Sequence, residues 1–315
     1  MKKVFFFLMA ALFVETQVMA QTPQEDFKRD VTLSACNYVA YRGPQKALTP
    51  APKGYKPFYL SHYGRHGSRY MIGKAAYDVP YYTLLKAQQE GKLTPKGEET
   101  LKKVTFIREE ARGRDGELTP LGALQHQGIT RRMMERFPEI FAGKTNIEAR
   151  STVVIRCILS MENGLQQMLR MNPQLQIFHD ASYHDMYYLN QKDKYLDSLE
   201  YCVGRKVKEA EFKSKHANYQ RVMTELFNDP AWVRQNVDQP DLNWKLFEMA
   251  GSVQGNFVAR SPFTTCLMTM KSILTGWGAM HIGRCRMVFR HILAMFVRFL
   301  SAIFCVTSSP KLIVV

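Results

Sequence analysis

The sequence alternates between short apolar segments and longer segments with helical periodicity, and this alternation restricts the fold more than any other feature. Residues 57–60 have the length and composition of a short buried strand, and residues 146–149 and 175–178 are two further strand candidates. Segments with helical patterns lie between or beside them, at 77–89, 94–111, 119–137 and 152–171. Strands that alternate with helices predict an α/β core with a mainly parallel sheet flanked by helices.

The region after the third apolar segment has a different character. Residues 187–248 combine many charges with helical patterns. We therefore predict an α-helical cap at 181–258, next to a core at 21–180. Within the core, Thr119 and Pro120 predict the start of a helix, because a Thr side chain caps free backbone N–H groups and Pro suits the first helical position.

The first twenty residues have the layout of a secretory signal peptide. Lys2 and Lys3 are basic, residues 4–14 are almost wholly apolar, and small residues precede a cleavage point after Ala20. The apolar run is short for a membrane span. We expect the mature protein to begin at Gln21 and to be secreted or periplasmic.

The net charge of +15 is unevenly distributed. Residues 249–315 contain seven basic and no acidic residues. The other 36 basic residues (43 less these seven) exceed the 28 acidic ones by eight, and leaving out Lys2 and Lys3 reduces the excess to +6. Such a charge suits anionic substrates such as phosphate esters, although charge alone does not separate these from nucleic acid.

The six cysteines do not indicate a metal or redox site. No two of them have CxxC spacing, which argues against a zinc site or a thioredoxin-type pair. An oxidising compartment would permit a disulfide, but the spacing does not identify a pair.

The most informative segment is His62–Tyr70, with the sequence HYGRHGSRY, directly after the first apolar segment. Ligand sites in open α/β sheets lie beyond the carboxyl ends of the strands. Arg65 and Arg69 stand on either side of His66, which suits a phosphate held by guanidinium groups beside an imidazole nucleophile. A neutral histidine can attack phosphorus and form a phosphohistidine that water hydrolyses.

This segment and three further blocks resemble the histidine phosphatases, in particular the multiple inositol polyphosphate phosphatase branch of the histidine acid phosphatases. The first block contains the Arg-His-Gly-x-Arg motif of that superfamily. The others are LTPLG at 118–122 with QH at 125–126, ARST at 149–152 with RC at 156–157, and HDMYY at 184–188. The resemblance covers roughly residues 31–200, in order.

The resemblance implies a phosphomonoesterase that removes phosphate from inositol polyphosphates such as phytate. Some members of the branch also act on 2,3-bisphosphoglycerate. His66 would be the nucleophile, and Arg65, Arg69 and Arg150 would bind the phosphate. No metal or other cofactor is implied, nor any nucleic-acid partner. The sequence departs from the commoner phytase pattern after Arg69, where residues 70–72 replace a Pro and a Thr.

Several nearby residues have simpler interpretations. His62 and His126 are expected to be structural, and Arg156 and Cys157 to pack within the core. A catalytic role for His184 and Asp185 is disfavoured by their position in the matching block.

The proton donor that the resemblance implies is missing. The family places it in a late His-Ala-Glu or His-Asp pair, and none occurs after residue 200. The candidates His216, His281 and His291 are not followed by a carboxylate at the required position. We expect weak turnover unless an unrecognised acid, such as Asp185 or Glu162, supplies the proton.

Residues 259–315 form a basic and apolar tail without a clear strand candidate. We expect an incomplete core there, and the simplest explanation of its composition is a shifted reading frame. A membrane-surface helix within it is an alternative. The other functions that stay open are a broad-specificity acid phosphatase and a phosphate-binding protein without catalysis.

Overall fold

The structure is a computed structural model. It describes residues 23–44, 46–47, 49–190, 194–200, 204, 207–208, 210–211, 219–255 and 312–314. The predicted signal peptide lies outside the described residues, as do His216, His281, His291 and most of the tail. Within the described part of the chain, no helix combines the length and apolar character that a membrane crossing requires.

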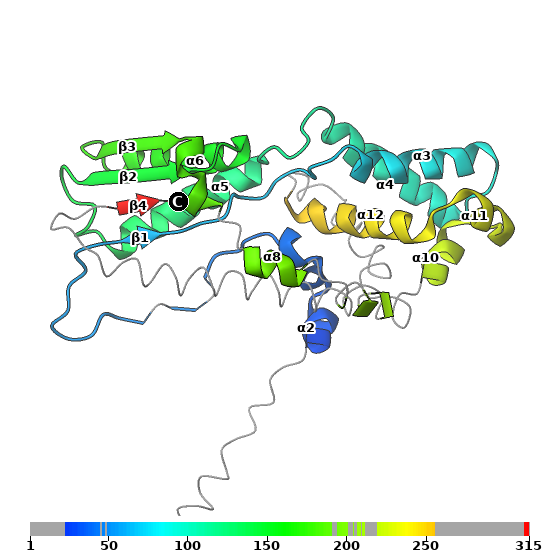
Figure 1. Ribbon diagram of the computed structural model, residues 1–315, viewed down its shortest axis with the longest axis horizontal. Coiled ribbons are helices and arrows are strands. Elements are labelled where there is room, and N and C mark those ends of the chain that lie inside the picture. Colours follow the sequence, from blue (N-terminus) through cyan, green and yellow to red (C-terminus); the bar gives the residue numbers. More distant parts are fainter. Residues whose placement is uncertain are drawn as a thin grey trace, which may run out of the picture.

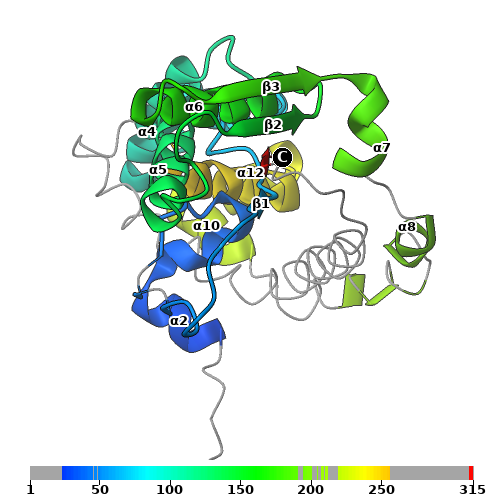
Figure 2. The same ribbon diagram turned by 90° about the vertical axis from the view of Figure 1, so that its left-hand side faces the viewer.

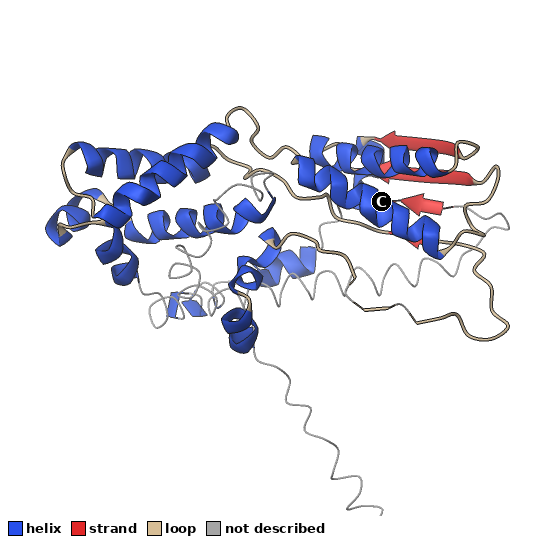
Figure 3. Cartoon of the chain, turned by 180° about the vertical axis from the view of Figure 1, so that it is seen from behind, coloured by secondary structure: helices blue, strands red, loops and turns tan. Residues whose placement is uncertain are grey.

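The chain has an α/β part and a helical part, which lie at opposite ends of its longest axis (Figures 1 and 3). The expected α/β fold class is confirmed. The α/β part consists of β1 (Ser61–His62), α5 (Pro120–Arg136), β2 (Asn146–Ser151), α6 (Ile155–Met171), β3 (Gln176–Ala181) and β4 (Leu312–Val314). The helical part consists of α3 (Ala75–Gln89), α4 (Pro95–Glu110), α10 (Tyr219–Leu226), α11 (Pro230–Asn236) and α12 (Gln239–Ser252).

Shorter elements lie beside these two parts. They are α2 (Pro23–Arg29), η1 (Val31–Tyr38), η2 (Tyr183–Asp185), α7 (Met186–Leu189), α8 (Lys194–Glu200) and η3 (Val253–Gly255).

The sheet is parallel, with the strand order β1-β4-β2-β3 (Figure 2). One face of β2 is buried through Ile147 and Ala149, which pack against Met134 of α5 and Met161 of α6. Burial of this apolar face holds both helices against the sheet. The predictions of a strand at 146–149 and of a parallel sheet are therefore confirmed.

Two sequence-based expectations about strands are wrong. Residues 57–60 do not form a buried strand: Phe58 is 80% exposed, and β1 begins only at Ser61. The reason is the partner strand, since β4 is short and reaches only Ser61 and His62. The tail does contribute a strand, because the β-branched and aliphatic run at 312–314 lies between β1 and β2.

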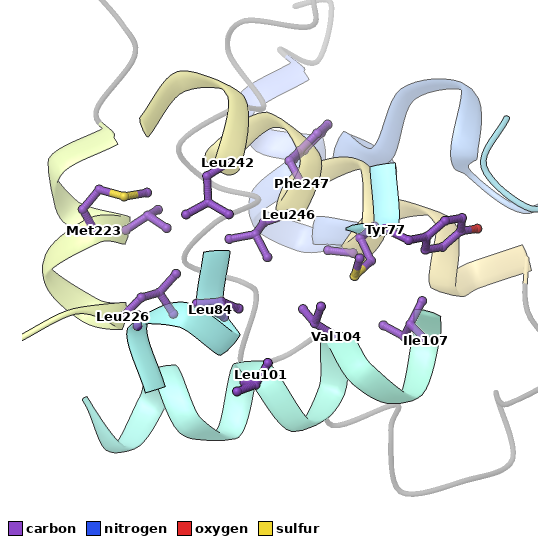
Figure 4. Close-up of a cluster of buried hydrophobic side chains, with 14 of the residues drawn as sticks. Tyr77, Leu84, Leu101, Val104, Ile107, Met223, Leu226, Leu242, Leu246 and Phe247 are labelled. Atoms are coloured by element: carbon purple, nitrogen blue, oxygen red, sulfur yellow. The ribbon is translucent and has the colours of Figure 1, made fainter. Parts of the chain in front are cut away.

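The helical part is built around aliphatic and aromatic side chains from α3, α4, α10 and α12 (Figure 4). Leu84, Val104, Leu246 and Phe247 are almost completely buried there. α3 and α4 come from the range predicted as core, whereas α10, α11 and α12 come from the range predicted as cap. The boundary between residues 180 and 181 stays a prediction.

Candidate active site

The segment that follows β1 is packed tightly against the start of α5. A Cβ atom added at Gly67 would lie 2.4 Å from the carbonyl oxygen of Gly122, and one added at Gly122 would lie 2.3 Å from that of Ser68. These distances leave no room for a side chain at either position. The two glycines therefore allow the loop and the helix to approach closely, which sets the position of His66.

Hydrogen bonds from two helices and a cap residue hold this loop. The backbone N–H of Gly67 donates to Ser160 Oγ (3.1 Å), and that of Ser68 donates to Gln125 Oε1 (2.8 Å). Thr119 donates to the Ser68 carbonyl oxygen through its hydroxyl (3.0 Å), and its Oγ1 accepts from Gly122 N–H as predicted for a helix cap. The conformation of the loop is thus fixed from both sides before any ligand binds.

His66 has one ring nitrogen engaged. Its Nδ1 lies 2.8 Å from the carbonyl oxygen of Gly67, so Nδ1 carries the proton and Nε2 keeps a free lone pair in the neutral ring. Burial, followed by the positive charges of Arg65, Arg156 and Arg69, lowers the pKa of His66 from 6.5 to about 4, against an opposing contribution from the Gly67 hydrogen bond. The imidazole is therefore neutral at neutral pH, the form that a nucleophile requires.

The three arginines near His66 come from different elements. Arg65 and Arg69 belong to the loop, as the sequence predicts, whereas Arg156 is the second residue of α6. The Nε atoms of Arg69 and Arg156 are buried without a hydrogen-bond partner. Unpaired buried donors are costly, which makes these guanidinium groups candidates for an anionic ligand.

A cavity of about 240 Å³ opens beside the loop. Arg65, His66 and Arg69 line it together with Gln125 and His126 of α5. The N-terminal segment and the end of α12 with η3 also line it, through Asn37, Tyr38, Val39, Tyr41, Ser252 and Gly255. The helical part of the chain therefore borders the loop that carries His66.

His66 also lines a smaller cavity of about 60 Å³. Arg65, His66 and His126 line both cavities, but Arg69 lines only the larger and Arg150 only the smaller. Arg150 Nε lies 3.4 Å from Asp185 Oδ2, and its Nη1 donates to the Ala149 carbonyl oxygen (3.0 Å). Arg150 therefore lies near His66, but its guanidinium group is already paired with the carboxylate of Asp185.

Two histidines with structural interpretations also line the smaller cavity. His126 Nε2 lies 3.1 Å from the Arg65 carbonyl oxygen, so it supports the loop. Burial lowers the pKa of His62 and of His126. Cys157, which also lines this cavity, is a free thiol.

Sequence reasoning missed the approach of Arg156 to His66 and the contribution of Tyr38. Arg156 was expected to pack within the core. A signal did exist for Arg156, since a helix start after a strand of a parallel sheet faces the same edge as the loop after β1. The sequence contains no comparable signal for Tyr38.

The described residues do not place a proton donor beside His66. Asp185 is paired with Arg150, and Glu162 Oε1 lies 2.6 Å from His179 Nδ1. Neither carboxylate lines a cavity that His66 lines. In the same part of the chain, no three His, Cys, Asp or Glu residues are grouped so that they could hold a metal ion.

No protein-family model matches the chain, and no curated protein matches it. Among solved structures, it is similar to the multiple inositol polyphosphate phosphatase of Bifidobacterium longum. The complex with inositol hexasulfate has a TM-score of 0.59 and 14% identity, over 89% of this chain and 77% of that one. The phosphate complex has a TM-score of 0.57 and 14% identity, over 87% and 75%. The apo form has a TM-score of 0.59 and 14% identity, over 89% and 76%. This likeness shows the fold, an α/β core with a helical cap.

Proposed function

We propose that this chain is a phosphomonoesterase in which Nε2 of His66 attacks phosphorus. One observation carries the proposal. His66 is a half-buried and neutral imidazole whose Nδ1 is engaged by Gly67 and whose charge environment is set by Arg65, Arg69 and Arg156. A site with several positive charges and a neutral nucleophile suits a phosphate ester, because the negative charge of the substrate balances the positive charge of the arginines.

The reaction has two steps. In the first, the Nε2 lone pair of His66 forms a bond to phosphorus while the bond from phosphorus to the ester oxygen breaks, and the leaving alkoxide takes a proton from water. In the second, water attacks phosphorus and gives up a proton to solvent, the electrons of the broken P–N bond return to Nε2, and inorganic phosphate leaves. Arg65 and Arg69, which line the larger cavity with His66, neutralise the non-bridging oxygens in both transition states, and Arg156 adds positive charge nearby.

The proposed substrates are inositol polyphosphates such as phytate. The similar phosphatase of Bifidobacterium longum was crystallised with phosphate and with inositol hexasulfate, which supports a highly anionic small molecule. The basic walls of both cavities fit such a ligand, and Arg150 remains a proposed phosphate contact from the smaller one. Activity toward 2,3-bisphosphoglycerate is a further proposal.

The absence of a carboxylate beside His66 in the described residues favours a second candidate, phosphate binding with little turnover. General acid catalysis contributes about 10²–10⁴-fold to a rate. From residue 249 onward the sequence contains no Asp or Glu at all. We therefore propose that phytate hydrolysis by this chain is slow, and faster turnover would identify an acid that sequence reasoning has missed.

The test is the phosphoenzyme. Rapid quench with labelled phytate should trap an acid-labile phosphohistidine, and His66→Ala should abolish it and lower phosphate release by about 10³-fold or more. His184→Ala is the matched control, because His184 is exposed and lines neither cavity. Equal turnover of His66→Ala and the unaltered chain would exclude His66 as nucleophile. A parallel assay with an aryl phosphate separates phytate specificity from that of a broad acid phosphatase.

Export is proposed on the basis of the first twenty residues alone. N-terminal sequencing of protein from the periplasm or the medium should find Gln21 first. Exported protein that still begins with Met1 would contradict cleavage after Ala20.

A further inference from the structure

We propose that Tyr38 and Glu248 position the guanidinium of Arg69, so that the helical part of the chain sets the phosphate affinity of the loop. This inference rests on the proposed function, because Arg69 is taken to bind phosphate. Tyr38 and Glu248 are positioning residues here, since they act through Arg69.

The first observation is the environment of Arg69. Its Cζ lies 5.5 Å from the centroid of the Tyr38 ring, within the range of a cation–π contact. Its Nη1 donates to the Tyr70 carbonyl oxygen (3.0 Å), while its Nε is buried without a hydrogen-bond partner. The ring and one backbone carbonyl therefore hold a guanidinium group that still has donors to offer.

The second observation is what holds the ring. The hydroxyl of Tyr38 donates to Glu248 Oε1 of α12 at 3.2 Å. Burial raises the pKa of Tyr38, so the phenol keeps its proton at neutral pH and remains a donor. In Figure 1, α12 runs from α11 toward the α/β part, and Glu248 belongs to the C-terminal end of this helix.

The third observation is that the segment around Tyr38 is fixed to the same end of α12. Gln254 donates to the Thr32 carbonyl oxygen (3.0 Å) and accepts from Ala40 N–H (3.3 Å), so it holds the chain on both sides of Tyr38. A Cβ atom added at Gly251 would lie 3.2 Å from Ala35 Cβ, which shows how closely η1 and α12 pack. The ring therefore has little freedom to move away from Arg69.

These contacts have a consequence for binding. A free arginine side chain loses rotamer entropy when it is ordered on a ligand, and a side chain that is already held loses less. Loss of the Tyr38 ring should therefore weaken phosphate binding by a factor between about 2 and 30, the range that a cation–π contact covers. The first bond of the reaction is unchanged, so we expect KM to rise more than kcat falls.

The experiment measures the Kd of inorganic phosphate by calorimetry for the full chain, its Tyr38→Leu variant, Arg69→Ala, and the double variant. If Tyr38 acts through Arg69, Tyr38→Leu weakens binding in the unaltered chain but not in the Arg69→Ala background. Equal losses in both backgrounds would overturn the inference. Tyr82→Leu is the matched control, because Arg108 Cζ lies 5.3 Å from the Tyr82 ring, far from the cavity in the helical part.

Two variants guard against a general loss of structure. Tyr38→Phe keeps the ring and should retain phosphate binding within about threefold, since only the contacts of the hydroxyl with Glu248 and Arg69 are lost. A loss as large as that of Tyr38→Leu would contradict positioning by the ring. Glu248→Ala keeps the Tyr38 ring but removes the hydrogen bond that restrains it. Any loss of phosphate affinity in this variant should also disappear in the Arg69→Ala background.

The proposed function fails separately from this inference. An unaltered chain that binds no phosphate would contradict the proposed function, and the positioning role with it. An unaltered chain that binds phosphate as tightly as Tyr38→Leu does would contradict only the positioning role.

Discussion

The helical part and the α/β part differ in how many of their buried polar side chains lack a hydrogen-bond partner. The interior of the helical part is aliphatic and aromatic, and Asn243 is the one residue of its described helices with buried side-chain atoms that lack a partner. The α/β part and its loops contain Ser61, Arg69, Thr152, Arg156 and Ser182, each with such an atom. Unpaired buried polar groups cost free energy, and two of these residues, Arg69 and Thr152, line the cavities beside His66, where a ligand can pair with them. The helical part therefore contributes mainly to stability, whereas the loop that carries the proposed nucleophile belongs to the α/β part.

The largest effect that would test this division is expected at Arg156. Arg156→Ala should lower kcat/KM for phytate by about 10²–10³-fold, because it removes one of the three positive charges that act on His66 and on the phosphoryl group proposed to bind there. Thermal stability should change little, since the loss of the unpaired buried Nε offsets the loss of the hydrogen bond that Nη1 donates to the Gly116 carbonyl oxygen (3.4 Å). Steady-state kinetics with a melting curve on the same sample measures both. Arg156→Lys should not restore activity, because Lys lacks the planar fork.

Arg150→Ala is the matched comparison for Arg156→Ala. Its removal leaves the buried carboxylate of Asp185 without this partner, so stability should fall by about 1–3 kcal/mol. The original prediction that Arg150 binds the phosphate requires a drop in kcat/KM as well. If Arg150→Ala reduces stability but leaves kcat/KM unchanged, Arg150 does not bind the phosphate.

The next effect concerns the geometry of the loop. A methyl group at Gly67 would collide with backbone atoms of Gly122, so Gly67→Ala must displace the loop that carries His66. A displacement of about 1 Å can cost about 10²-fold in rate, and we expect a loss of this size in phytate hydrolysis. Gly73→Ala is the control, because no atom lies within 4 Å of its added Cβ. Full activity of Gly67→Ala would show that the loop tolerates movement.

The predictions from sequence were best where a local pattern determines the structure. Thr119 and Pro120 mark the start of α5, and the segment after β1 brings Arg65 and His66 to the edge of the sheet. The sequence could not predict residues whose role depends on packing between distant elements. Tyr38 meets Glu248 across a separation of 210 positions. The strand β4 has only three residues, too few for any periodicity to be recognised.

A third test uses pH, and its effect should be smaller. Burial lowers the pKa of His66 to about 4 and also lowers those of His62 and His126. Between about pH 4 and pH 6.5 the unfolded chain therefore binds more protons than the folded one, so stability falls as pH falls through this window. We expect a decrease in Tm of roughly 5 °C or more.

Phosphate should oppose this decrease, because its negative charge favours the protonated imidazole. His66→Asn should flatten the dependence of Tm on pH, whereas a change at the exposed His184, such as His184→Asn, should leave it as it is. A Tm that stays constant from pH 7 to pH 4.5 would contradict the burial of neutral histidines in the α/β part.

The smallest effect is expected in the helical part, where the unpaired polar group has no cavity to serve. Asn243 is 1% exposed, its Oδ1 and Nδ2 lack partners, and it lines neither cavity around His66. Asn243→Leu has a similar volume and removes both unpaired atoms, so the free energy of unfolding should rise by about 1 kcal/mol. Asn236→Leu should not be stabilising, because exposed Asn236 makes hydrogen bonds with Lys86 and Trp232. Urea unfolding of both variants measures the difference. If Asn243→Leu is instead destabilising, Asn243 has a hydrogen-bond partner, and the contrast between the two parts in their unpaired polar groups no longer includes it.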